Sequence, residues 1–283
     1  MSRVAVVTDS TADLPADLAE VLGLRIVPLS VTFGDETFIS RITITDRDFY
    51  GRLASADELP TTSQPAPAWF EEAYGDAVDD EATAIVSLHV SGALSGTCDL
   101  ARAIGSDAPV PVEVVDSRQV SGGLALQVLA AHRVALDGGD VPDVVAAAAA
   151  VQEATCSFLV VDTLDHLRKG GRLSPAQATV GNVLRVKPVL GVVDGAVELL
   201  ERTRTWGRAL DRMVELVAAS VGPEPAHVVV AHALAPDRAA ELRGRLEERL
   251  EVAERLDVVM GPVVGTHVGP GAVAVAACPA SLT

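Results

Sequence analysis

The stretch that decides the fold runs Ala84-Ile85-Val86-Ser87-Leu88-His89 and continues, after Val90, with Ser91-Gly92-Ala93-Leu94-Ser95-Gly96-Thr97. Its first part is a short apolar run that predicts a buried strand, and its second part places small residues and hydroxyls before an expected helix over residues 95–104. A strand that passes directly into a helix is typical of a parallel sheet covered by helices. The turn between them is the usual position for an anionic group, because free backbone N–H groups point outward there.

The same alternation of strand and helix extends through the first half of the chain. Further strands are expected near Val4–Thr8, Leu24–Leu29 and Val110–Val115, and helices over Pro15–Val21, Thr45–Ala54, Pro67–Ala77, Ser121–Leu136 and Val141–Ala154. Several of these helices open with a Ser, Thr or Asp that can cap the first turn. We therefore expect an α/β/α lobe with a parallel sheet over residues 1–156.

A second pattern begins at Phe158, where strand signals no longer alternate regularly with helices. Strands are expected over Phe158–Asp162, Pro188–Val193, Ala196–Glu201, His227–His232, Leu256–Met260 and Ala272–Ala276, with helices over Leu164–Lys169, Pro175–Leu184, Thr205–Val221 and Pro236–Leu250. Asp194-Gly195 predicts a hairpin turn. Because 283 residues exceed what one core usually covers, we expect a second α/β lobe with a mixed sheet over residues 157–283 and a cleft between the lobes.

The amino-acid composition disfavours some classes of binding partner. The net charge of −17 and the pI of about 4.6 disfavour nucleic acid, whose binding needs clustered Lys and Arg. No apolar run approaches the roughly 20 residues of a membrane helix, and the first residues read directly into a strand, so we expect a soluble, cytoplasmic protein without an integral membrane segment. Cys98, Cys156 and Cys278 lack the spacing of zinc ligands, so no metal site is expected.

Two segments gather hydroxyl groups. Pro60-Thr61-Thr62-Ser63-Gln64-Pro65 places three hydroxyls between prolines, and the residues 91–97 place Ser95 and Thr97 at a strand-to-helix turn. A stiff segment of this kind can aim its hydroxyls at a ligand, although a helix cap and turn would use the same residues. The two segments together favour a binding site.

Two further segments carry a histidine and most of the clustered positive charge. Residues 261–271 surround His267 with glycine, proline and short apolar residues, which indicates close approach of a ligand or of another backbone. Residues 167–174 contain Arg168, Lys169 and Arg172, and Arg202, Arg204 and Arg208 form a second group. Arg pairs with carboxylate or phosphate, but cations at helix C-termini are an equally simple explanation.

At these segments the sequence resembles the DegV family of bacterial proteins. The resemblance covers nearly the whole chain and is carried by six motifs in the family's order: Thr8 to Pro15, Pro60 to Pro65, Leu94-Ser95-Gly96-Thr97, Val115-Asp116-Ser117, Lys169-Gly170-Gly171-Arg172-Leu173-Ser174 and Gly261 to Gly271. It implies the two-lobed fold expected above, with an acyl chain buried between the lobes. The characterised members are fatty-acid-binding subunits of a two-component fatty acid kinase.

The resemblance also implies a role for individual residues. Thr62, with Thr61 adjacent, and Ser95 would hold the carboxyl group of a long-chain fatty acid, with His267 nearby. Arg172, and Arg202 or Arg204, would face the phosphate or the kinase partner, an ATP-binding subunit that forms acyl phosphate for phospholipid synthesis. The chain itself would have no catalytic residue and no cofactor beyond the bound fatty acid, and a transient contact with a membrane is compatible with this role.

The sequence departs from the family pattern at Gly92, where a second serine often follows the first, so one hydroxyl expected near the head group is absent. Two other classes of function stay open. One is a stand-alone enzyme, a hydrolase or a carbonyl-substrate kinase domain that uses His267, although neither GxSxG nor a nucleotide-binding loop occurs. The other is a sensor that binds lipid without delivering it.

Overall fold

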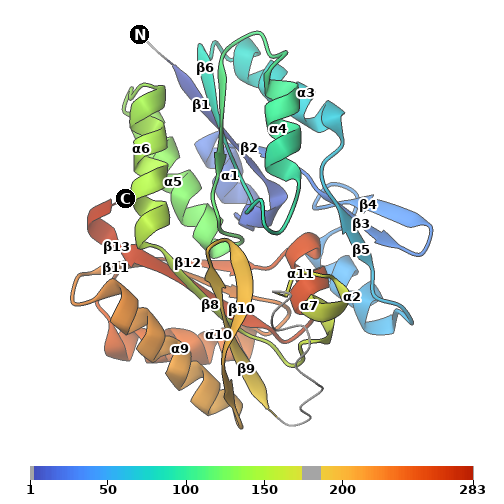
Figure 1. The fold of residues 1–283 in the computed structure, drawn as a ribbon, viewed down its shortest axis with the longest axis vertical. Helices are drawn as coiled ribbons and strands as arrows, with labels where there is room; N and C mark the ends of the chain where they lie inside the picture. The colour runs from blue at the N-terminus through green and yellow to red at the C-terminus, as the bar shows by residue number, and fades with distance from the viewer. Residues whose placement is uncertain (1–2, 174–185, 283) are drawn as a thin grey trace.

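The structure is a computed structural model that describes residues 3–173 and 186–282. Figure 1 shows two α/β layers, with the N-terminal half of the chain around one sheet and the C-terminal half around another. The helix predicted over residues 175–184 lies outside the described residues. In the described part of the chain, no helix is long and apolar enough to cross a membrane.

The first sheet is parallel throughout and has the order β2-β1-β6-β7. Its strands are β1 (Val4–Asp9), β2 (Arg25–Val27), β6 (Ala84–His89) and β7 (Val112–Asp116), and its helices are α1 (Ala16–Leu22), α3 (Pro67–Asp79), α4 (Thr97–Gly105), α5 (Gly122–Leu136) and α6 (Val141–Ala154). Val7 and Ile85 pack against α3 and α4, whereas Val6 and Val86 pack against α5 and α6. This alternation along each strand buries both faces of the sheet, so the predicted α/β/α arrangement is confirmed.

A small antiparallel sheet, which the sequence patterns did not predict, stands beside the first lobe with the order β4-β3-β5. It consists of β3 (Ser30–Phe33), β4 (Glu36–Ile39) and β5 (Thr61–Ser63), with α2 (Asp46–Ser55) between β4 and β5. Pro60 and Pro65 flank β5, which is an edge strand, and this is where a sheet tolerates proline. The segment expected to be a stiff turn is therefore a strand that holds its hydroxyls in register with β3.

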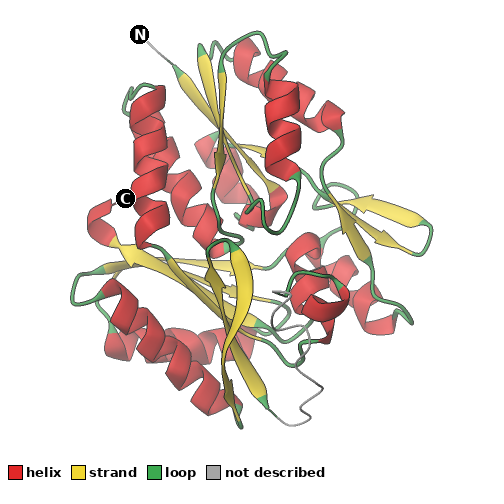
Figure 2. Cartoon of the chain, viewed as in Figure 1, coloured by secondary structure: helices red, strands yellow, loops and turns green. Residues whose placement is uncertain are grey.

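The second sheet is mixed and has the order β10-β9-β8-β13-β11-β12. Its strands are β8 (Cys156–Val160), β9 (Lys187–Val193), β10 (Ala196–Thr203), β11 (Ala226–His232), β12 (Val252–Val259) and β13 (Val273–Pro279). Only β11 and β12 pair in parallel. The helices α9 (Trp206–Val221) and α10 (Pro236–Arg249) cover its outer face, as Figure 2 shows. The predicted α/β class with one parallel and one mixed sheet is confirmed, while the division at residue 156 stays a prediction.

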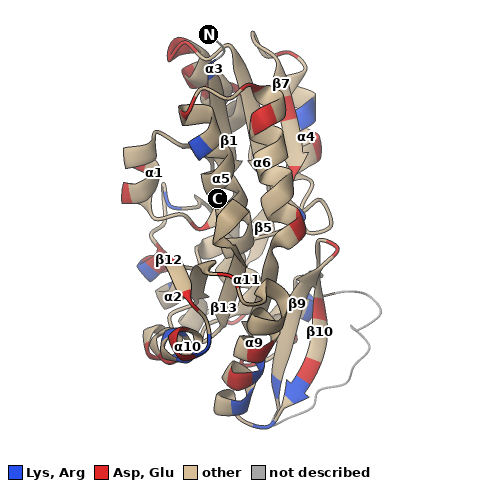
Figure 3. Cartoon of the chain, turned by 90° about the vertical axis from the view of Figure 1, so that its left-hand side faces the viewer, with Lys and Arg blue, Asp and Glu red and all other residues tan. Residues whose placement is uncertain are grey.

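Helix α5 contacts both sheets. Ten of its 15 residues are buried, which agrees with the nearly uninterrupted small and apolar residues of its sequence. Two short helices, α7 (Asp165–Lys169) and α11 (Pro262–Val268), contact each other. The segment 261–271, for which no helix was expected, thus contains α11. In the view of Figure 3 the acidic residues are spread over both lobes, so the net negative charge is not confined to one of them.

Candidate functional site

A cavity of about 80 Å³ lies where β5, the turn before α4, the end of α7 and α11 meet. It has a polar group of lining residues, Thr11, Thr62, Ser63, Gln64, Ser95, Arg172 and His267, and an apolar group, Leu29, Val90, Leu94, Val120, Leu167, Val197, Val263, Val264 and Val268. Three of the expected head-group residues, Thr62, Ser95 and His267, therefore share one cavity. We call this cavity the polar end.

Thr62 and His267 are 205 positions apart and form a direct hydrogen bond of 2.8 Å between Thr62 Oγ1 and His267 Nε2. The other ring nitrogen, His267 Nδ1, is buried and has no hydrogen-bond partner among the described residues. A side chain at Gly170 would bring its Cβ within 2.3 Å of Nδ1, so the glycine makes room for the imidazole. Burial, with smaller contributions from Arg172 and His166, lowers the pKa of His267 to about 4. The ring is neutral at physiological pH.

Arg172 joins two of the motifs at the polar end. Its Nε donates to the Leu94 carbonyl at 3.1 Å and its Nη1 to the Gly170 carbonyl at 2.7 Å. Ser95 lies one residue beyond Leu94, and its hydroxyl forms a 2.8 Å hydrogen bond with that of Thr97. The guanidinium thus fixes the turn that carries Ser95. Arg172 is part of the cavity wall, whereas the sequence assigned it only to the kinase or the phosphate.

The structure places the other candidates away from the cavity. Thr61, the first residue of β5, is exposed and does not line it, although Thr62 and Ser63 of the same strand do. Arg202 and Arg204 are also exposed and do not line it. Leu173 pairs with Val197, and Arg202 lies five residues further along β10, roughly 17 Å away at about 3.3 Å per residue. Thr61 is therefore not part of the cavity wall, and the expected role of Arg202 or Arg204 toward the phosphate or the kinase stays a prediction.

Gly92 also lies outside the cavity, so a serine there would add no hydroxyl to it. Its backbone N–H donates to the Asp116 carboxylate, and a Cβ would come within 2.7 Å of Asp116 Oδ2. At this position the turn faces Asp116, and the effect of the glycine on the set of head-group donors stays a prediction. The glycine instead permits close approach of that carboxylate.

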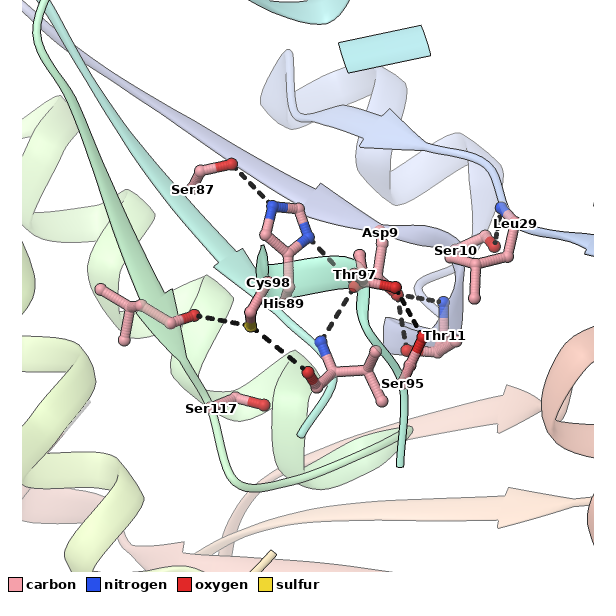
Figure 4. A network of polar contacts seen from close by, with 12 residues as sticks. Asp9, Ser10, Thr11, Leu29, Ser87, His89, Ser95, Thr97, Cys98 and Ser117 are labelled. Carbon is pink, nitrogen blue, oxygen red and sulfur yellow. Dashed lines mark hydrogen bonds and ion pairs between the residues drawn. The ribbon is translucent and has the colours of Figure 1, made fainter. Parts of the chain in front are cut away.

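Thr11 lines the polar end, although the sequence singled it out only as part of a family motif. It follows β1, and its Oγ1 lies 2.6 Å from Asp9 Oδ1. Figure 4 shows it beside Ser95, with Asp9 and His89 behind it. The position could have been found from the sequence, because the carboxyl ends of neighbouring parallel strands meet at one edge of a sheet and both β1 and β6 end here.

A second cavity, of about 60 Å³, adjoins the first and is almost entirely apolar. Val120, Val197, Val264 and Val268 line both cavities. Beyond these valines the second cavity is lined by α5 and the inner face of the mixed sheet, through Ser121, Gly122, Gly123, Ser157, Phe158, Leu159, Val192, Val229, Ala231, Met260, Ala274, Val275 and Ala276. We call it the apolar end. Together the two ends form a site with hydrogen-bonding groups at one side and hydrocarbon at the other.

Three side chains are arranged like the catalytic triad of a hydrolase, but they are not accessible to a substrate. Ser87 Oγ lies 2.7 Å from His89 Nε2, and His89 Nδ1 lies 3.0 Å from Asp9 Oδ2, the bonding order of a Ser-His-Asp triad. All three side chains are fully buried, so a substrate has no access to the serine. In the described residues, no group of three or more His, Cys, Asp or Glu is arranged to hold a metal ion.

Comparison with known proteins places this architecture in a family. The family model of DegV, described as uncharacterised proteins, matches residues 3–280. A DegV domain-containing protein of Streptomyces coelicolor is 43% identical over 273 residues, which cover 96% of this chain and 97% of that protein. Several other bacterial proteins of the same description are similarly related.

Solved structures agree with the sequence match. A DegV family protein of Thermus thermophilus, described as fatty acid binding, superimposes with a TM-score of 0.91 at 34% identity and covers 98% of this chain and 99% of that one. DegV of Bacillus subtilis, described as a fatty acid binding protein, superimposes with a TM-score of 0.89 at 31% identity and the same coverage. On sequence and fold alike, this chain belongs to the DegV family.

Proposed function

We propose that this protein binds one long-chain fatty acid, with the carboxyl group at the polar end and the acyl chain directed into the apolar end. The observation that carries the proposal is that the two cavities adjoin and share four valines in their walls. The relatives from Thermus thermophilus and Bacillus subtilis, both described as fatty acid binding, support it.

The polar end suits a carboxyl group that is to be handed over. A buried carboxyl group is costly unless it is hydrogen-bonded, and Thr62, Ser95 and His267 supply neutral hydrogen-bonding groups from three separate segments. Neutral hydroxyls hold the head group more loosely than a bidentate Arg clamp would. Arg172, the one cation that the described residues contribute to the wall, already donates two hydrogen bonds to backbone carbonyls.

The apolar end supplies most of the affinity. Each buried methylene contributes about 0.8 kcal/mol, so a chain of about 15 methylenes contributes on the order of 12 kcal/mol before ordering costs are subtracted. Both cavities are smaller than the roughly 300 Å³ of ordinary ligand pockets. We therefore expect the valines between them to separate when an acyl chain enters.

We further propose that the protein acts in the cytoplasm, without a catalytic centre of its own, and presents the carboxyl group to a separate ATP-dependent fatty acid kinase. The product would be an acyl phosphate for phospholipid synthesis. The placement of the hydroxyls at the carboxyl ends of β1 and β6, at the margin of the lobe, is compatible with access by a partner.

Reconstitution tests this role. The protein loaded with radiolabelled palmitic acid is incubated with ATP, with and without a purified fatty acid kinase from the same organism, and acyl phosphate is trapped with hydroxylamine as the hydroxamate. We expect hydroxamate only when protein, kinase and ATP are all present. Binding without turnover in the complete mixture would favour a lipid sensor, and turnover without the kinase would favour a stand-alone enzyme.

A further inference from the structure

The hydroxyl of Thr11 is held by a buried carboxylate. Thr11 Oγ1 and its backbone N–H lie 2.6 Å and 2.9 Å from Asp9 Oδ1. On the other oxygen, His89 Nδ1 and the Val90 N–H lie 3.0 Å and 2.9 Å from Asp9 Oδ2. Figure 4 shows these contacts converging on Asp9, which is fully buried. Four hydrogen-bond partners therefore surround one carboxyl group.

The groups that surround Asp9 determine which atom donates each hydrogen bond in this network. The two backbone N–H groups can only donate, and an ionised carboxylate can only accept, so the His89 ring carries a proton on Nδ1, which faces Asp9. Burial acts to raise the pKa of Asp9, but the hydrogen bonds and the charge of its partners outweigh burial and lower it. Asp9 is therefore ionised and accepts from all four partners.

Thr11 and Thr62 therefore present different hydrogen-bonding groups to the cavity. The single hydroxyl proton of Thr11 is committed to Asp9, so only oxygen lone pairs remain for a ligand. His267 Nδ1 is buried without a hydrogen-bond partner in residues 3–173 and 186–282, and an unprotonated nitrogen there costs less than an orphaned N–H. The ring proton then sits on Nε2 and points at Thr62 Oγ1, which leaves the Thr62 proton free to donate.

We propose that Thr11 is a specificity-determining hydrogen-bond acceptor, so that the polar end selects a head group that both donates and accepts, a protonated carboxyl group, over acceptor-only anions such as sulfonates. Asp9 and His89 are positioning residues for the Thr11 hydroxyl. Arg172 lies in the same wall, and its positive charge favours an anion. Its Nε and Nη1, however, donate to the backbone carbonyl groups of Leu94 and Gly170. The inference rests on the proposed function, because it concerns the head group of the same acyl ligand.

Three probes with the same 16-carbon chain test the assignment: palmitic acid, palmitamide and hexadecane-1-sulfonate. The amide carries a donor and an acceptor without charge, whereas the sulfonate carries acceptors only. Each is titrated into the wild-type protein and into Thr11→Val and Thr11→Ser by displacement of a fluorescent fatty acid. In the wild type we expect palmitamide to bind within about tenfold of the acid and the sulfonate at least tenfold more weakly, the loss for about one unmet hydrogen bond.

Thr11→Val, which keeps the shape and removes the acceptor, should weaken the acid and the amide about tenfold and leave the sulfonate unchanged. Thr11→Ser should behave as the wild type, and it serves as the folded control if the valine variant has a lowered Tm. A wild-type protein that binds the sulfonate as tightly as the acid and rejects the amide overturns the assignment of Thr11 while the proposed function stands. A wild-type protein that binds none of the probes overturns the proposed function itself.

Discussion

The polar end and the apolar end of the site are built in opposite ways. The polar end is assembled from short pieces far apart in the chain, as the hydrogen bond between Thr62 and His267 across 205 positions shows. The apolar end is made by α5 and by neighbouring strands of one sheet, with small residues such as Gly122 and Ala276 facing inward. The first arrangement fixes orientation and chemistry, and the second provides affinity in proportion to the hydrocarbon it covers.

The largest effect is expected from removing two hydroxyls at the polar end together. Thr62→Val with Ser95→Ala leaves the carboxyl group buried without two of its partners, at about 1.5 kcal/mol or more for each. We expect the affinity for palmitic acid to fall roughly 100-fold, measured by displacement titration below the Tm of the variant, which the loss of the hydrogen bond between Thr62 and His267 should lower. Thr61→Val, at an exposed position of β5 outside the cavity, is the matched control and should bind as the wild type. Undiminished binding by the double variant would remove these residues from the site.

The next effect concerns the apolar end and compares two neighbouring residues of β13. Ala276 faces the cavity, whereas Ala277 packs on the outer face of the sheet. Ala276→Leu should fill the space of about three methylenes and weaken palmitic acid by about 2 kcal/mol, while decanoic acid is affected less. Ala277→Leu, which adds the same volume to the other face, should cost stability without changing the preference for chain length. Equal chain-length profiles in the two variants would contradict the assignment of this cavity.

His267 is expected to make the stability of the protein depend on pH. Its pKa is about 4 in the folded protein and near 6.5 when unfolded, so below pH 6.5 the unfolded chain takes up a proton that the folded protein does not. The free energy of unfolding should therefore decrease from pH 6.5 to pH 4, by about 3 kcal/mol from this group.

Urea unfolding of the wild type and of His267→Gln at pH 7 and pH 4.5 measures this contribution. The variant should lose less stability between the two pH values, because it lacks the titrating ring, while other groups titrate in both proteins. Parallel stability changes in the two proteins would mean that the imidazole is exposed to solvent in solution.

The smallest effect on binding is expected from the arginines. Arg172→Ala removes hydrogen bonds to the Leu94 and Gly170 carbonyls and should weaken palmitic acid a few-fold through the turn that carries Ser95. Arg204→Ala, exposed and outside the cavity, should leave binding unchanged and slow only phosphorylation by the kinase, if that surface meets the partner. Displacement titration and hydroxamate formation report on the two properties separately. Loss of lipid from Arg204→Ala would show that the two roles are misassigned.

Local patterns in the sequence were sufficient for most elements but not for the contacts between them. The parallel strands could be predicted because each is a short apolar run followed by a capped helix, as at residues 84–97. Strand β5 could not, because it has only three residues and its partner β3 is 30 positions away. A periodicity argument has no information about such pairing.

The same distinction applies to the site. Thr62, Ser95 and His267 were expected together because the family resemblance joined their motifs, and the structure brings all three to one cavity. The face on which Thr61 lies depends on the register between β5 and β3, and the position of Arg202 depends on the direction of β10. Such features follow from tertiary structure, which the residue pattern of a short segment does not specify.

The central claim, that one acyl chain occupies the joined cavities, is tested most directly by native mass spectrometry of the purified protein, followed by denaturation and extraction of whatever it carries. We predict an added mass of one long-chain fatty acid per chain, which is lost on denaturation and recovered in the extract, and which decreases in Thr62→Val with Ser95→Ala. A protein that is purified without such a mass, and that stays without it when offered long-chain acids, would contradict the account.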